Sequence, residues 1–224
     1  MSPRLEVSRS VARAWSRLLR RARASDFEDR EFLRAGSSPS LTLWMTGPRP
    51  RRILVTTKAT WIGWAEAAIP AGLLVVQRYG LPSQAHVEWV RETGMRMGAK
   101  IVFVGDLDPL DLTIFAAWRS GNPAFREGRE RPLPIRYGGI ADGWARRAGG
   151  FQEWSSRIRI AMQPFERDHW ALLKRLLPDA EAHVGADCFR LLEGGHKVEI
   201  EGATNPAIHG RGFPGTVLRA LGRR

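Results

Sequence analysis

The sequence has few of the residues that covalent and zinc-based scaffolds need. Cys188 is the single cysteine among 224 residues, so no disulfide can form within the chain, as suits a reducing cytoplasm. The five histidines are far apart and do not have the spacing of zinc ligands. We therefore expect neither a disulfide framework nor a zinc site.

Long apolar runs are also missing. The longest, AAIPAGLLVV, contains a proline and is much shorter than the ~20 residues that a membrane-spanning helix requires. The N-terminus lacks the apolar stretch of a secretory signal. It shares its arginines and serines with transit peptides, but a plain basic helix is favoured. We expect a cytoplasmic protein with no membrane partner.

Acidic residues are scarce relative to basic ones. There are 35 basic and 23 acidic residues, which gives a net charge of +12. Positions 1–52 hold 12 basic and 5 acidic residues, or +7, which is more than half of the total. This charge favours a polyanionic partner such as DNA, because basic side chains release counterions from phosphates. An arginine-rich solvated surface is the alternative.

The pattern of residues divides the chain into three parts. Positions 1–50 comprise a basic amphipathic helix over 1–24 and a linker, whose Ser, Pro and Gly residues extend over 35–52. Residues 51–203 form the main domain, since 43% apolar residues suffice for one sizeable core. Residues 204–224 form a basic tail. In the first part we predict that the DNA contacts are Arg20, Arg21 and Arg23.

Apolar strands alternate with helix-length segments in the main domain. We predict strands over 53–55, 72–77 and 100–105, and helices over 60–69, 83–98 and 111–119. A short strand within 134–140 and a helix over 166–177 follow. Continuously apolar strands separated by helices are typical of an α/β fold with a parallel sheet covered on both faces.

Two aspartates follow the third of these strands, in the segment KIVFVGDLDPLDL. Ligands of open parallel sheets gather at the carboxyl ends of the strands, where Asp106 and Asp108 are expected. Alternation along an extended backbone turns both side chains to the same side. Two such carboxylates suit Mg²⁺ or Mn²⁺, which completes its shell with water and phosphate oxygens. Alternatively, Asp108 and Pro109 cap the following helix.

Basic side chains follow the other two strands. Lys58 comes after the first strand and is expected at the same sheet edge, where it could hold a phosphate or neutralise the acids. A solvated lysine at a helix start is the alternative. Arg78 follows the second strand, before a helix N-terminus that could receive an anion. A tight turn into that helix explains the same residues.

The order of ILVTTKATW, VVQRYGLPSQAHVEWV and KIVFVGDLDPLDLTIF resembles the Toprim domain. The similarity is to the form found in the topoisomerase VI A subunit, the meiotic double-strand-break protein and the Wadjet nuclease subunit. It extends over residues 51–203 and includes Lys197, Glu199 and Glu201 in KVEIEG. The resemblance implies a Toprim-like, Rossmann-like parallel sheet flanked by helices. The residue pattern adds a basic N-terminal helix and a helix-rich C-terminal extension to this sheet. It also implies magnesium-dependent chemistry on DNA.

Two departures from the family pattern weaken the catalytic expectation. Thr57 occupies the position of a glutamate at the end of the first strand, and a hydroxyl cannot supply that charge. The nucleophilic tyrosine of an upstream winged-helix domain has no counterpart, because the two tyrosines are Tyr79 and Tyr137. Candidate replacement acids are Asp111, Glu66, Glu88, Asp142, Glu199 and Glu201.

Three functional hypotheses remain. The first is a magnesium-dependent, DNA-processing nuclease or topoisomerase-like module that uses Asp106, Asp108 and Lys58 within a complex of partner subunits or as a homo-oligomer. The second is a catalytically inactive Toprim-like module that binds DNA or acts as a scaffold. The third, a haloacid dehalogenase-like phosphatase with Asp106 as nucleophile, is disfavoured because Leu110 stands where that motif has Thr or Val.

Overall fold

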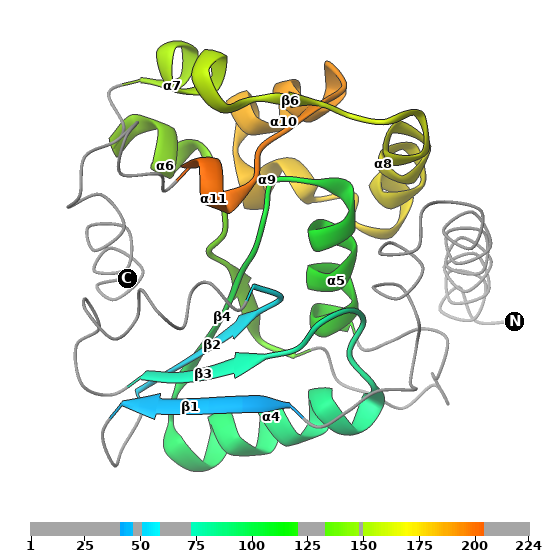
Figure 1. The fold of residues 1–224 in the computed structure, drawn as a ribbon. Coiled ribbons are helices and arrows are strands. Elements are labelled where there is room, and N and C mark those ends of the chain that lie inside the picture. The colour runs from blue at the N-terminus through cyan, green and yellow to red at the C-terminus, as the bar shows by residue number, and fades with distance from the viewer. Residues whose placement is uncertain (1–40, 47–50, 59–72, 121–132, 148–149, 204–224) are drawn as a thin grey trace, which may run out of the picture.

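Four parallel strands form the centre of the structure. The computed structural model describes residues 41–46, 51–58, 73–120, 133–147 and 150–203. The strands are β1 (Thr42–Thr46), β2 (Arg52–Thr56), β3 (Leu73–Gln77), β4 (Lys100–Val104) and β5 (Ile135–Tyr137). They form one sheet in the order β1-β3-β2-β4-β5, in which only β1 is antiparallel to its neighbour (Figure 1). The predicted α/β class is thus confirmed.

The strands are apolar along their whole length because both faces of the sheet are covered. Ile53 of β2 lies in register between Leu74 of β3 and Ile101 of β4. Its neighbours Leu54 and Val55, which point to opposite faces, are both buried. Alternating polar residues would leave unpaired polar groups inside the protein, so the continuous apolar pattern follows from the architecture.

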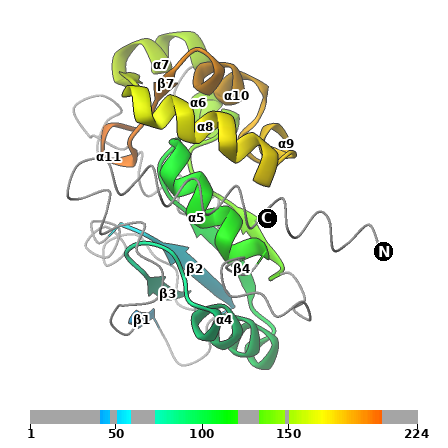
Figure 2. The same cartoon turned by 90° about the vertical axis from the view of Figure 1, so that its right-hand side faces the viewer.

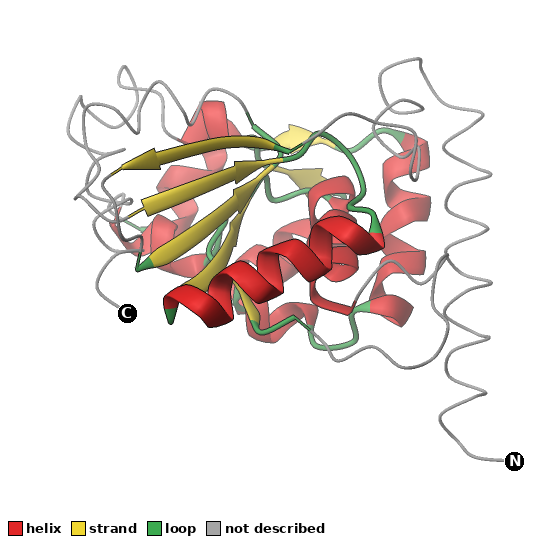
Figure 3. Ribbon diagram, turned by 90° about the horizontal axis from the view of Figure 1, so that it is seen from below, coloured by secondary structure: helices red, strands yellow, loops and turns green. Residues whose placement is uncertain are grey.

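Helix α4 (Gln84–Met97) covers one face of the sheet (Figure 3). It begins with a capping box, in which the amide of His86 donates to Ser83 Oγ and the amide of Ser83 donates to His86 Nδ1. It ends at Gly98, whose positive φ of 59° gives the left-handed turn that glycine adopts without strain. The helix predicted over 83–98 is confirmed.

Helix α5 (Pro109–Ser120) covers the other face and is itself covered by a second helical layer (Figure 2). Ten consecutive residues, 109–118, are buried, as expected of a helix enclosed on all sides. The outer layer consists of α6 (Asp142–Arg147), α7 (Phe151–Ile158), α8 (Pro164–Leu176), α9 (Ala180–Val184), α10 (Ala186–Glu193) and α11 (Ile200–Ala203). The C-terminal part of the main domain is helix-rich, as predicted.

The strand order creates a topological switch point between β2 and β4. The chain passes from β2 to β3 on one side and then to β4 on the other side of β2. Connections therefore diverge from the carboxyl ends of β2 and β4, and in open α/β sheets ligands bind at such a point. A short ladder of β6 (Ile160–Ala161) and β7 (His196–Lys197), together with a backbone bridge between Leu107 and Val198, brings the C-terminal segment to this edge.

One segment differs from its predicted structure. Thr42–Thr46, within the predicted linker, instead form the antiparallel edge strand β1, which adds backbone hydrogen bonds to β3. The predicted helices over 1–24 and 60–69 and the basic tail over 204–224 lie outside the described residues. Among the described helices, none combines the length and apolar character needed to cross a membrane.

Candidate functional site

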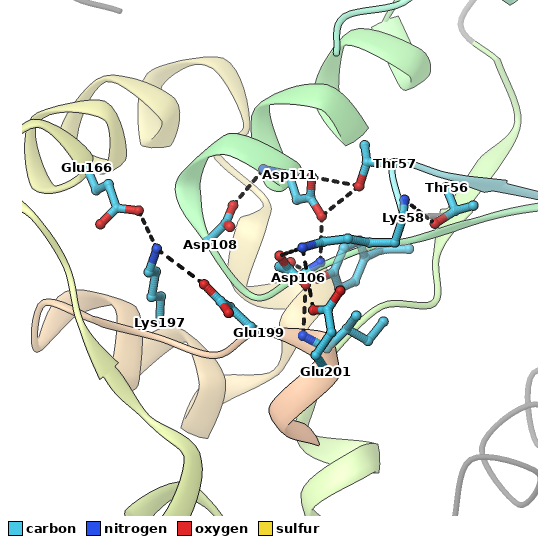
Figure 4. A network of polar contacts seen from close by, with 12 residues as sticks. Thr56, Thr57, Lys58, Asp106, Asp108, Asp111, Glu166, Lys197, Glu199 and Glu201 are labelled. Atoms are coloured by element: carbon cyan, nitrogen blue, oxygen red, sulfur yellow. Dashed lines mark hydrogen bonds and ion pairs between the residues drawn. The ribbon is translucent and has the colours of Figure 1, made fainter. Parts of the chain in front are cut away.

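Lys58 and Asp106 meet at the switch point, after the ends of β2 and β4 (Figure 4). The Nζ of Lys58 lies 2.7 Å from Asp106 Oδ2. The second oxygen, Asp106 Oδ1, accepts a hydrogen bond from the backbone amide of Ile200 at 2.8 Å. The ion pair therefore joins the two parallel strands, and the amide ties the C-terminal segment to the same carboxylate.

Asp111 brings a third carboxylate to the end of β2. Thr57 Oγ1 donates to its two oxygens, which lie 3.0 and 3.1 Å away, and the amide of Asp106 donates to Asp111 Oδ2 at 2.6 Å (Figure 4). Thr57 thus contacts a carboxylate where the Toprim pattern has a glutamate. Of the five candidate replacement acids that the structure describes, Asp111 is the one that lies against Thr57.

Gly105 permits this close approach. A Cβ atom at Gly105 would lie 2.4 Å from Asp111 Oδ2, a distance that the buried carboxylate could not avoid. The loop is also fixed from behind, because Tyr137 Oη donates to the carbonyl of Asp106 at 3.0 Å. The backbone that carries Asp106 is therefore held on two sides before any ligand binds.

Asp108 caps helix α5. Its Oδ1 accepts the amide of Asp111 at 2.7 Å, and Pro109 opens the helix, where a missing N–H has no cost. The capping interpretation of Asp108 is thus confirmed. The cap uses Oδ1 and orients the carboxylate at the same edge as Asp106 and Asp111 (Figure 4).

The three aspartates are buried, and burial raises the pKa of each. Asp106, Asp108 and Asp111 are 3%, 7% and 2% exposed. Burial, and then the charge of Asp108, raises the pKa of Asp106 to about 7 even though Lys58 opposes the shift. Burial also raises the pKa of Asp108. Burial and the charges of Asp106 and Asp108 raise the pKa of Asp111 well above its ordinary value.

Lys58 stays positively charged at this edge of the sheet. Burial alone lowers the pKa of a lysine, but the charge of Asp106 and the hydrogen bond to it outweigh that effect and raise the pKa of Lys58 well above its ordinary range. Glu201 adds a second, longer contact at 3.5 Å. The Lys58 side chain is 27% exposed, so a ligand at the sheet edge can reach it.

A second ion pair lies beside the first, and one of its members is absent from the sequence predictions. Lys197 Nζ is 2.8 Å from Oε1 of Glu166, which is 2% exposed, and 3.8 Å from Glu199 (Figure 4). The signal for Glu166 is the pattern Gln163-x-x-Glu166 before a helical run: the Gln163 amide donates to Glu166 Oε2, as in a capping box. Its pairing with Lys197 bridges 31 positions and has no local signature.

The remaining candidate acids lie elsewhere. Glu88 is exposed on α4 and accepts a hydrogen bond from Gln84. Asp142 accepts the backbone amides of Asp187 and Cys188 at the start of α10. Glu66 lies outside the described residues.

The predicted DNA-binding arginines receive little structural support. Arg78 is 4% exposed, and its Nη1 donates to the carbonyl of Tyr79. Burial also lowers the pKa of Arg78. This side chain stabilises the turn after β3, and its DNA contact stays a prediction. Arg20, Arg21 and Arg23 lie outside the described residues.

The donor set suits a hard divalent cation only in part. Within the described residues, no group of three or more His, Cys, Asp and Glu side chains is arranged to hold a metal ion. Mg²⁺ does not require such a group, because one or two carboxylates plus water and phosphate oxygens complete its shell. The buried carboxylate oxygens of Asp106 and Asp108 fit that requirement. One of these oxygens, Asp106 Oδ2, is in contact with Lys58.

The chain matches no protein-family model, and no curated protein shows significant sequence similarity to it.

Proposed function

We propose that this protein is a Toprim-like module that binds DNA and cleaves phosphodiester bonds with the help of Mg²⁺ or Mn²⁺. The observation that carries the proposal is the cluster of three buried carboxyl groups at the switch point. Three carboxyl groups, each at most 7% exposed, lie close together there, and the Lys58 ammonium contacts one of them, Asp106. Burying like charges together is costly, and a cation relieves that cost.

Each residue has a distinct role in this proposal. Asp106 and Asp108 would hold the ion, which when bound supplies positive charge to the phosphate and lowers the pKa of a water ligand. Lys58 would exchange its contact with Asp106 for a phosphate oxygen, since both are anionic oxygen acceptors. Asp111 is tied to Thr57 and to the Asp106 amide, so it would position the loop.

DNA is the proposed substrate because the net charge is +12 and its largest share lies in positions 1–52. No tyrosine corresponds to the nucleophile of the transesterases, so hydrolysis by water is the reaction that the chain alone could perform. We further propose that partner subunits, or other copies of the chain, complete the assembly.

A second candidate is a non-catalytic Toprim-like module that binds DNA or acts as a scaffold. The observation in its favour is that both Asp106 oxygens already have partners, Lys58 and the Ile200 amide. In this alternative the ammonium permanently takes the place of the metal ion, and Thr57 stands where the acid was lost.

The two candidates are separated by a plasmid-nicking assay with purified protein and Mg²⁺ or Mn²⁺. The first predicts metal-dependent nicking that falls at least ~100-fold in Asp106→Ala and in the isosteric Asp106→Asn, because several kcal/mol of charge stabilisation are lost. Glu153→Gln, on the exposed face of α7, is the matched control and should keep its activity. Nicking that survives in both Asp106 variants would refute the first candidate, and a wild-type protein inactive with either metal would favour the second.

A further inference from the structure

A cavity of about 300 Å³ lies at the carboxyl end of β5, next to the loop that carries Asp106. Its walls come from the end of β5, the start of α6 and the end of α9. Gly138 and Gly139 form the wall nearest the candidate site. Gly139 packs so closely on that loop that a Cβ atom there would lie 2.7 Å from the carbonyl oxygen of Gly105.

The lining of the cavity is positively charged. Arg136 and Arg146 both line it and are exposed at its surface. The acidic residue in the lining, Asp142, is engaged, because its two oxygens accept the amides of Asp187 and Cys188. These bonds leave the carboxylate charged, but two guanidinium groups outnumber it, so a ligand in the cavity would meet an excess of positive charge.

His183 also lines the cavity. Its Nε2 lies 2.8 Å from Arg119 Nη1 and 3.3 Å from Asp179 Oδ2. Burial lowers the pKa of His183, which favours the neutral ring. The cavity wall thus carries two guanidinium groups, the Asp142 carboxylate and the His183 ring.

We propose that this cavity binds a phosphate group of a nucleotide unit, held by Arg136 and Arg146. The planar guanidinium fork matches phosphate oxygens in geometry and charge. The volume is at the lower end of the range for ligand pockets, ~300–1,000 Å³, and suits one nucleotide-sized unit. The choice of a nucleotide among phosphate compounds rests on the proposed function, whereas the phosphate site rests on the cavity and its charge.

The test is the affinity for a fluorescein-labelled single-stranded oligonucleotide, measured by anisotropy in EDTA at several salt concentrations. Arg136→Gln and Arg146→Gln should each weaken binding several-fold and reduce the slope of log K against log salt by about 1. Ala182→Glu, which adds a carboxylate at an exposed position of the lining, should weaken binding more than Ala182→Gln. Arg157→Gln, on the exposed face of α7 and outside the lining, is the matched control.

The source of the phosphate is identified by competition with deoxyadenosine monophosphate. If deoxyadenosine monophosphate competes with the oligonucleotide, and Ala182→Glu abolishes this competition, the site also binds free nucleotides. If the monophosphate does not compete, the site binds phosphates within strands. Either result is compatible with the phosphate site. The proposal is overturned if Arg136→Gln, Arg146→Gln and Ala182→Glu all bind the oligonucleotide like the control. Because the assay contains no free metal ion and measures no cleavage, its result is independent of the nicking assay.

Discussion

The carboxylate of Asp111 is costly to bury, yet it holds the loop that carries Asp106. Its carboxylate is 2% exposed beside Asp106 and Asp108, so folding must bury three acids within one loop and the first turn of α5. Hydrogen bonds from Thr57 and the Asp106 amide partly offset that cost. Such an arrangement is typical of sites that give up stability for function.

The raised pKa values of these acids predict how stability depends on pH. In the metal-free protein the folded state keeps the acid protons to higher pH than the unfolded chain, in which the carboxyl pKa is near 3.8. The folded state therefore binds more protons between about pH 4 and pH 7, and its stability falls as pH rises through that window.

Asp111→Asn removes one of these charges and keeps the side-chain shape. In EDTA at pH 8 we expect its free energy of unfolding to exceed that of the wild type by on the order of 1 kcal/mol, with the gap closing toward pH 4. Urea unfolding at several pH values measures this. Asp187→Asn, whose side chain is 41% exposed, is the matched control. A variant less stable than the wild type at pH 8 would contradict the prediction.

Single residues were predictable where local pattern determines their position. Asp106 and Asp108 follow a clear apolar strand, and a parallel sheet carries such residues to one edge. Lys58 was predicted at the same edge for the same reason. The contact between Thr57 and Asp111 spans 54 positions and depends on how α5 packs, so the sequence placed Asp111 only among six candidate acids.

At the scale of elements, the segment after α10 closes the site. The bridge between Leu107 and Val198 aligns it with the Asp106 loop, and the amide of Ile200 reaches Asp106 Oδ1. Helix α8 anchors the same segment through Glu166 and Lys197. The Asp106 loop, helix α8 and the segment after α10 are distant in sequence. The buried carboxylates of Asp106 and Glu166 hold them together.

Glu166→Gln tests the anchor formed by α8. The variant can keep the hydrogen bond from the Gln163 amide but leaves Lys197, whose side chain is 17% exposed, with the more distant Glu199. We expect a loss of about 1–2 kcal/mol in the free energy of unfolding, and a partial recovery in Glu166→Gln combined with Lys197→Met. Urea unfolding measures both. A loss no larger than that of Glu153→Gln would show that the pair is not an anchor.

Elements were predicted best where the apolar pattern is long. Strands β2, β3 and β4 and helices α4, α5 and α8 correspond to predicted segments, with ends shifted by a few residues. Strand β1 was missed because Ser, Pro and Gly around it resemble a linker, and an edge strand is specified by the partner it pairs with. Helix α5 begins at Pro109, two residues before the predicted start, because Asp108 is the cap.

In the molecule as a whole, the fold brings charged side chains together at the carboxyl edge of the parallel strands. The carboxyl ends of β2 and β4 carry Lys58 and Asp106, and the cavity with Arg136 and Arg146 lies at the end of β5 on the same edge. The buried aspartates and the two arginines thus lie on one side of the sheet. The α/β class followed from the order of apolar segments, whereas this division of charge required the three-dimensional structure.

Binding of Mn²⁺, followed by electron paramagnetic resonance at pH 8, is the sharpest test of a metal site at Asp106 and Asp108, because it requires no substrate. We expect one bound Mn²⁺ per chain, displaced by excess Mg²⁺ and weakened at least ~10-fold in Asp106→Asn and in Asp108→Asn, since each removes one anionic ligand. Glu153→Gln should bind like the wild type. A wild-type chain that binds no Mn²⁺, or one whose binding survives both aspartate substitutions, would contradict the account.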